Sequence, residues 1–283
     1  MALDVAQMLL DLYDSDPGNH FEDPALGPLF DPPLVGAADA DDPWFERFKE
    51  LIGDFHWTPQ EALALVAPEA RARSVICWAL PKGRTARADN ARETEAPART
   101  WAYVRTFGEQ MLDRMRNGLA ERLRALGYAA IPPAIAPENT WADRPRVGLS
   151  TCWSERHVAM VAGLGTFGLS GGLITVRGIA HRAGSVVTDA EIAPTPRPYG
   201  DDPFAWCLRL SRGTCGACAQ RCPAGSIGET LEARDKEACR RHGAAIHASR
   251  RALFGWEGVY GCGLCQTRVP CEARNPTAAG GEP

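Results

Sequence analysis

The sequence lacks the features of a membrane or secreted protein. Its 283 residues contain no run of about 18 apolar residues, the length that a membrane-spanning helix needs. Residues 1–20 lack the basic flank, the long apolar region and the small-residue cleavage site of a secretory signal. These absences predict a cytoplasmic location without membrane attachment, where thiols stay reduced.

The sequence also lacks a composition typical of disorder. Hydrophobic residues make up 45% of the chain and charged residues 23%, as in ordinary folded proteins. The small net charge of −4 conceals a division, because residues 204–274 carry eleven Lys and Arg against six Asp and Glu. Two readings of this basic region stay open. It docks an acidic electron donor or a nucleic acid, or it offsets the negative charge of thiolate-bound metal clusters.

The chain is longer than most single domains, so two domains, or one large domain with an extension, are expected. We predict N-terminal helices and an extended arm packed on the core over 1–70, and an α/β domain over 71–200. A proline-rich linker near residue 200 separates it from a cysteine-rich domain over 201–274, and 275–283 form a disordered tail.

Local patterns predict the elements of the first two domains. Amphipathic spacing indicates helices over residues 5–12, 43–52, 60–66 and 112–126. Dense prolines, glycines and acidic residues over 13–42 indicate a surface arm, and the polar segment 82–100 indicates a loop that borders a site. Apolar runs over 74–80, 128–131 and 182–188 predict strands. A strand, helix, strand order favours an α/β layer, with Cys77 as a small core residue.

A glycine-rich segment near the middle of the chain has the spacing of a dinucleotide-binding turn. Gly163, Gly165 and Gly168 satisfy G-x-G-x-x-G, but residues 154–161 before them look helical, whereas the dinucleotide motif needs a strand there. Nicotinamide binding is therefore disfavoured. A tight turn that lets a large cofactor approach the backbone and a purely structural turn both remain open.

Eight of the ten cysteines lie within residues 207–271, in a pattern typical of metal ligands. Cys215, Cys218 and Cys222-Pro223 match the end of the bacterial ferredoxin run C-x2-C-x2-C-x3-C-P, although Arg212 replaces its first cysteine. If the ligands interleave as in two-cluster ferredoxins, the first [4Fe–4S] cluster takes Cys207, Cys215, Cys218 and Cys271, and the second takes Cys222, Cys239, Cys262 and Cys265.

Zinc is the alternative metal, because paired Cys-x2-Cys motifs also build tetrahedral zinc sites. A single four-cysteine zinc site would leave Cys222-Pro223, Cys239 and the flanking cysteines unexplained. Two iron–sulfur clusters account for all eight thiols and would pass electrons from a surface donor to a deeper acceptor.

The order of these motifs resembles epoxyqueuosine reductases and their relatives among the reductive dehalogenases. The resemblance rests on Glu155-Arg156, the glycine segment, Gly184 with Thr188-Asp189, and the double-cluster cysteines. It implies two [4Fe–4S] clusters that supply electrons to a cobalamin held on an α/β domain. The cobalamin contacts that it implies are Gly163, Gly165, Gly168, Leu169 and Ser170.

The sequence departs from the family at its proton donor. The aspartate that stands six residues before the glutamate falls at Leu149, which cannot donate a proton. Candidate chemistry then comes from Cys152, Glu155 and His157, directly ahead of the glycine turn. Cys152 is a ligand, a proton donor, a redox thiol or an inert buried thiol. His157 protonates a product or is a hydrogen-bonded helix histidine.

The predicted fold class is α+β, with an α/β cofactor or substrate domain followed by a bacterial two-[4Fe–4S] ferredoxin-like domain. The predicted function is a cytoplasmic iron–sulfur reductase with a small-molecule or nucleoside substrate and a low-potential electron donor of the ferredoxin or flavodoxin type. The alternatives are an electron-transfer or assembly partner without a substrate, and a tRNA-modifying epoxyqueuosine reductase. Leu149 and the lack of a helical repeat extension disfavour tRNA as a partner.

Overall fold

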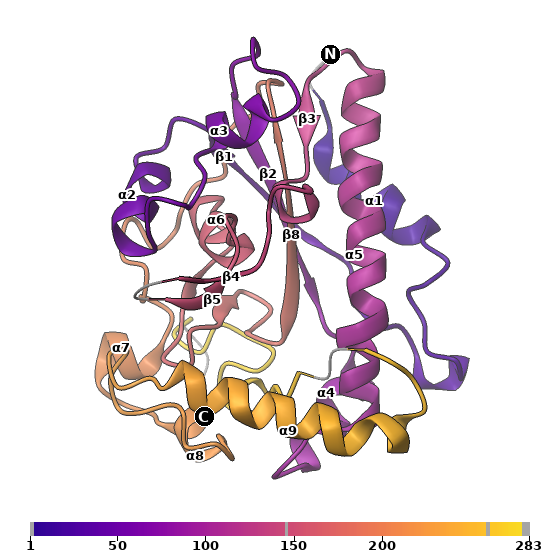
Figure 1. The fold of residues 1–283 in the computed structure, drawn as a ribbon, viewed down its shortest axis with the longest axis vertical. Coiled ribbons are helices and arrows are strands. Elements are labelled where there is room, and N and C mark those ends of the chain that lie inside the picture. The colour runs from indigo at the N-terminus through magenta and orange to yellow at the C-terminus, as the bar shows by residue number, and fades with distance from the viewer. Residues whose placement is uncertain (1–2, 145–146, 259–260, 279–283) are drawn as a thin grey trace.

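The computed structural model describes residues 3–144, 147–258 and 261–278. At its centre is a four-stranded sheet in the order β1-β2-β8-β3 (Figure 1). The strands are β1 (Leu34–Asp39), β2 (Ser74–Pro81), β8 (His181–Thr188) and β3 (Ala130–Ile131). Every residue of β2 is buried, because other strands flank it and helices cover both of its faces.

All neighbouring strands in this sheet are antiparallel, which corrects the expectation of an α/β layer. The expected strand, helix, strand order is present in β2, α5 (Arg99–Ala125) and β3. However, β8 comes later in the chain and pairs with both strands, so β2 and β3 are not neighbours. The mixture of helices with an antiparallel sheet is consistent with the α+β class.

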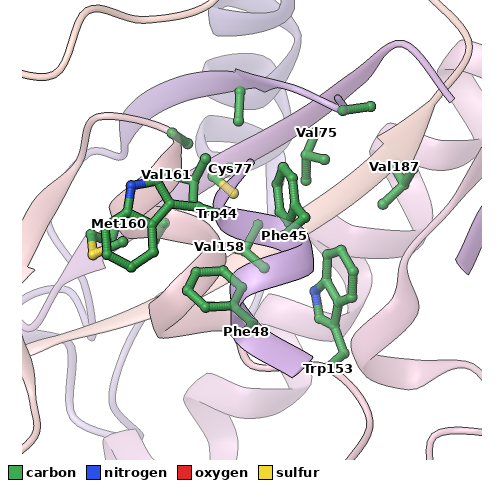
Figure 2. Packing of buried hydrophobic residues seen from close by; sticks show 14 of the residues in the cluster. Trp44, Phe45, Phe48, Val75, Cys77, Trp153, Val158, Met160, Val161 and Val187 are labelled. Carbon is green, nitrogen blue, oxygen red and sulfur yellow. The ribbon is translucent and has the colours of Figure 1, made fainter. Parts of the chain in front are cut away.

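Each face of the sheet carries its own hydrophobic core. On one face, Cys77 and Val187 pack under α2 (Trp44–Leu51), α3 (Pro59–Ala64) and α6 (Glu155–Val161), as Figure 2 shows for the aromatic residues of α2. On the other face, Ile76 and Trp78 pack under α1 (Val5–Ser15) and α5. The alternation along β2 follows from the two-residue period of a strand.

Most helices and strands of the first two predicted domains are confirmed. Helices α1, α2, α3 and α5 cover the predicted helical segments, and β2, β3 and β8 cover the predicted strands. Helix α3 begins with a capping box, in which the Thr58 hydroxyl accepts a hydrogen bond from the Glu61 amide and the Glu61 carboxylate accepts one from the Thr58 amide.

Two predicted irregular segments are wrong. The segment 13–42 contains the short helix η1 (Pro24–Leu26) and strand β1, which pairs with β2 over its whole length. The predicted loop 82–100 contains helix α4 (Arg84–Arg92). This helix lacks apolar periodicity but is held by buried Asn90, which donates a hydrogen bond to Thr267 and accepts one from the amide of Ala98.

Short elements lie between strands β3 and β8 of the sheet. They are η2 (Pro133–Ile135), the hairpin of β4 (Ala142–Arg144) with β5 (Gly148–Ser150), and the hairpin of β6 (Gly165–Phe167) with β7 (Leu173–Thr175). The second hairpin begins at Gly165, contains Gly168 and lies between helix α6 and strand β8 in the chain.

The cysteine-rich region is built from α7 (Leu208–Arg212), α8 (Ala217–Gln220), α9 (Lys236–Phe254) and η3 (Leu264–Gln266). Helix α9 lies across one end of the molecule (Figure 1). The described part of 201–274 contains no strand, so the structure does not show a ferredoxin-like domain. Residues 279–283 of the predicted tail lie outside the described residues. No helix in the described part of the chain is long and apolar enough to cross a membrane.

Candidate metal centre

Four cysteines from separate segments line one cavity, which has about 30 Å³ of free volume and is partly open to solvent. They are Cys207, Cys215, Cys218 and Cys271, the four residues predicted to bind the first cluster. Cys207 caps the N-terminus of α7 and Cys218 lies in α8. The structure therefore brings together thiols that are up to 64 residues apart in the sequence.

Cys215 has an unusual backbone conformation at this cavity. Its φ is 78°, in the left-handed region that residues other than glycine rarely adopt. Such a conformation persists only where the surrounding structure enforces it, and it often occurs at ligand-binding positions. Here it belongs to the turn between α7 and α8, two helices that each carry a cysteine of the same set at or next to their start.

The other four cysteines lie near one another outside this cavity. Cys222 accepts a hydrogen bond from the Ser226 amide at 3.3 Å, and Cys239 is exposed on the first turn of α9. Cys262 and Cys265 flank Gly263 at the start of η3. Cys239 and Cys222 both raise the pKa of Cys262, which indicates that these thiols are close enough to repel as thiolates.

Burial and mutual repulsion raise the pKa of several of these thiols. Burial is the larger cause, and it raises the pKa of Cys218 and Cys262 to about 11 and that of Cys265 to about 12. The pKa of Cys271 is raised by burial and then by Cys218, Cys207 and Cys215. A bound metal supplies the positive charge that lets such crowded thiols ionise.

The thiols do not converge on one point. Among the described residues, no three His, Cys, Asp or Glu side chains are arranged to hold a single metal ion. Zinc would require four sulfurs about 2.3 Å from one centre. Thiols spaced around a cavity instead fit a larger group that contains several metal atoms, such as a [4Fe–4S] cluster ligated by four cysteines.

The first part of the glycine segment packs closely against other backbone segments of the protein. Helix α6 precedes it, as predicted, so the strand that a dinucleotide-binding turn needs is missing. A side chain at Gly163 would lie 2.9 Å from the Pro196 carbonyl oxygen, and one at Gly165 would overlap the Ile174 carbonyl. At these two positions, glycine is required by close packing of one backbone segment against another.

The later residues of the segment have a different environment. Gly168, Leu169 and Ser170 line the same cavity as the first four cysteines. The five positions predicted to contact a cofactor are therefore divided between a packed turn and the border of the cysteine-lined cavity. Their roles toward a cofactor stay predictions.

His157 lies in an aromatic environment at the start of α6. Its Nδ1 and the Ser154 hydroxyl are 2.6 Å apart, and its ring packs against Phe48 and Phe167. Burial lowers the pKa of His157 well below its ordinary value, and the nearby positive charge of Arg156 lowers it further. The imidazole is therefore neutral at pH 7, and its proton-donor role stays a prediction.

Glu155 forms an ion pair with a buried arginine that the sequence analysis did not identify. The Arg116 Nε donates to Glu155 Oε1 at 3.2 Å, and Arg116 also binds Glu109 and Asp113. Burial raises the pKa of Glu155, and Arg116 acts in the opposite direction. The sequence feature that could have identified Arg116 is its position in the apolar stripe of α5, between Leu112 and Leu119.

Cys152 is buried beside α6 and is held by its backbone. Its amide donates to Asn139 at 2.7 Å, and its carbonyl accepts from the amide of Trp57. No side chain in the described part of the protein forms a hydrogen bond with its thiol. Leu149 is 51% exposed on β5 and pairs with Asp143 of β4, so the position that the resemblance aligns with a proton donor is at the surface.

Comparison with solved structures shows which proteins share this fold. The catabolic reductive dehalogenase NpRdhA matches with a TM-score of 0.51 at 13% identity, over 96% of this chain and 36% of that protein. An epoxyqueuosine reductase solved with a tRNA stem loop matches with a TM-score of 0.49 at 18% identity, over 95% of this chain and 66% of that protein.

The epoxyqueuosine reductase of Streptococcus thermophilus matches with a TM-score of 0.47 at 17% identity, over 88% of this chain and 65% of that protein. This chain thus spans slightly less than two thirds of the epoxyqueuosine reductases that it matches. Its sequence matches no family model and no curated protein. The resemblance to the reductive dehalogenase therefore holds for the fold.

Proposed function

From a fold like that of epoxyqueuosine reductases and reductive dehalogenases, we propose that this protein is an iron–sulfur oxidoreductase with two [4Fe–4S] clusters. The observation that carries the proposal is the cavity lined by Cys207, Cys215, Cys218 and Cys271, with four further cysteines beside it. In this proposal the second cluster is held by Cys222, Cys239, Cys262 and Cys265. The clusters would supply single electrons at low potential.

The chain's own residues shape the surroundings of both sets of thiols. Leu169, Ile179 and Val269 give the first cavity an apolar border, which limits solvent near the thiols. At the second set, the positive charge of Arg221 lowers the pKa of Cys262. Solvent exclusion and nearby charge are two means by which a protein sets a cluster's reduction potential.

Cobalamin does not fit the glycine turn that was expected to hold it. Protein backbone fills the space beside Gly163 and Gly165, and the cavity at Gly168 has about 30 Å³ of free volume and is lined by cysteines. That volume is far below that of a pocket for a drug-sized ligand, and a corrinoid is larger still. Cobalamin is therefore not part of the proposed function.

The proposed electron donor is a low-potential protein of the ferredoxin or flavodoxin type. Cys239, a proposed ligand of the second cluster, is exposed on α9, and Arg240 and Arg241 follow it. These two arginines share the carboxylate of Glu237, so the positive charge of this turn exceeds the negative charge. A basic surface beside an exposed ligand favours an acidic donor.

Anaerobic reconstitution with iron and sulfide tests the metal content. The wild-type protein is expected to hold about eight irons, four for each set of four cysteines. Cys218→Ser and Cys239→Ser should each retain about half of this iron, because each removes a ligand from a different set. The matched control is Cys77→Ala, which alters a buried thiol of the sheet and should leave the iron content unchanged.

Two results would overturn the metal assignment. One is zinc without iron in protein purified and reconstituted anaerobically. The other is loss of all iron, or of none, in both ligand variants. Electron paramagnetic resonance of the reduced ligand variants provides a second readout, because each variant should show one remaining cluster signal.

An electron relay without its own substrate is the second candidate function. It is favoured by the packed backbone at Gly163 and Gly165, where a substrate-binding turn would need open space. Reduced protein with a relay function would pass electrons to an acceptor protein but would not turn over small molecules. Steady reduction of a small molecule or nucleoside, dependent on both cysteine sets, would exclude this alternative.

A further inference from the structure

Lys82 is a buried cation that neither cysteine set explains. It follows β2 directly and is 3% exposed. Its Nζ lies 3.6 Å from the centre of the Trp101 ring. Among the described residues, no carboxylate, carbonyl or hydroxyl oxygen forms a hydrogen bond or ion pair with this amine. A buried lysine without such a partner is either neutral or paired with a group from outside the chain.

Other cations surround Lys82. Arg182 of β8 and Arg105 of α5 are close enough that their positive charges contribute to lowering the pKa of Lys82, after burial. Both arginines pair with the same carboxylate, Glu109, which also accepts a hydrogen bond from Arg116. Glu109 thus pairs with three guanidinium groups. Burial and the nearby arginines favour the neutral form of Lys82 in the protein alone, and a bound anion would favour its ammonium form.

The same face of the sheet carries further hydrogen-bond donors that the protein does not use. In the described structure, the Nε of Arg182 and the indole Nε1 of Trp78 are buried without a hydrogen-bond partner. Strand register places Arg182 opposite Leu80 and Trp78 opposite Gly184, so both side chains project toward α5. Both of these atoms are donors, so they favour a ligand that accepts hydrogen bonds.

We propose that Lys82, Arg105 and Arg182 form a binding site for an oxyanion, the carboxylate or phosphate group of a small molecule. Lys82 supplies the free charge, and Arg182 supplies an N–H that Glu109 does not use. The flat indole of Trp101 holds the lysine from one side and packs against Gly263, between Cys262 and Cys265. The site therefore lies between the central sheet and the second set of cysteines.

Thermal unfolding in different anions tests this site without requiring metal or activity. The melting temperature of the purified protein is measured in sodium phosphate, sodium acetate and sodium chloride at equal ionic strength. Isothermal titration with phosphate and with acetate gives the affinities. Phosphate or acetate should raise the melting temperature saturably above the chloride value, and the anion that binds more tightly identifies the preferred group.

Lys82→Met removes the charge and keeps an apolar stem against Trp101. It should weaken binding of the preferred anion at least tenfold, and Lys82→Arg should recover part of the affinity. Lys49→Met is the matched control, because it removes an ammonium on α2 that already pairs with Glu61. This control should bind the anion like the wild type.

The proposal is overturned if neither anion binds the wild type more tightly than chloride, the result expected if water alone satisfies these donors. It is also overturned if Lys82→Met and Lys49→Met bind the anion equally well. If Lys82→Met does not fold, Lys82→Arg decides: a reduced but measurable affinity supports the site, and an affinity equal to that of Lys49→Met contradicts it. Thermal unfolding and anion titration do not depend on bound metal. They therefore test the anion site even if the iron content contradicts the proposed function.

Discussion

At the residue scale, the thiols and the buried arginines differ in how far the sequence reveals them. The spacing of the cysteines identifies them, because Cys-x2-Cys pairs are typical of two thiolates that bind the same metal group. No such pattern identifies Lys82 and Arg116, because their burial depends on residues elsewhere in the chain. Trp101, which covers Lys82, lies nineteen positions later, and Glu155, which pairs with Arg116, lies on another helix.

Arg116→Met is expected to lower the free energy of unfolding by about 3 kcal/mol, because it leaves the buried carboxylate of Glu155 without its ion pair. Arg71→Met, which breaks an exposed pair with Asp41, should cost about 0–1 kcal/mol. Urea unfolding at pH 7 measures both changes. Equal, small losses in the two variants would show that Arg116 does not neutralise Glu155.

At the scale of elements, substitutions in the glycine turn test whether its glycines are required by backbone packing or by contact with a cofactor. Gly165→Ala should lower the free energy of unfolding by about 3 kcal/mol, because the new methyl group overlaps the Ile174 carbonyl and the backbone cannot yield easily. Gly243→Ala in α9 meets nothing within 4 Å and should stabilise by about 1 kcal/mol.

Thermal and urea unfolding of these two glycine variants provide the measurement. A fully stable Gly165→Ala protein would contradict close backbone packing and would return this turn to the candidates for cofactor contact. The Gly243 variant shows whether loss of backbone freedom alone accounts for any change.

The elements that the sequence did not predict share a physical cause. Strand β1 lies among prolines and acidic residues, and only its pairing with β2 makes it a strand. Helix α4 has mostly polar residues, and the hydrogen bonds of Asn90 attach it to the cysteine-rich region. In contrast, β2 is a continuous apolar run and the second half of α5 has a periodic apolar face, so the sequence was enough to predict both. The first half of α5, from Arg99, was not predicted.

At the scale of the whole molecule, buried His56 and the partly buried His157 and His181 make stability depend on pH. Burial lowers the pKa of His56 and His181 to about 4 and lowers that of His157 well below 6.5. The unfolded chain therefore binds more protons than the folded one below pH 6.5. Stability is fully present above about pH 6.5 and is lost as the pH falls towards about 4.

Each histidine contributes a slope of at most about 1.4 kcal/mol per pH unit in this range, and the three together about 4 kcal/mol. Glu155 acts in the opposite direction, because burial raises its pKa. Urea unfolding at pH 7, 6 and 5 measures the net slope. His56→Gln should reduce this slope by up to about 1.4 kcal/mol per pH unit, and an unchanged slope would show that His56 is not buried and neutral.

The position of β8 also determines when the protein can assemble during synthesis. This strand fills the gap between β2 and β3, yet it begins only at His181, after nearly two thirds of the chain. A ribosome adds about 5–20 residues per second, so for several seconds the emerging chain presents β2 with one edge unpaired. The first proposed ligand, Cys207, follows β8 by only nineteen residues. The sheet can therefore close shortly before the proposed ligand thiols leave the ribosome, so the insertion of the proposed clusters would take place on a folded sheet.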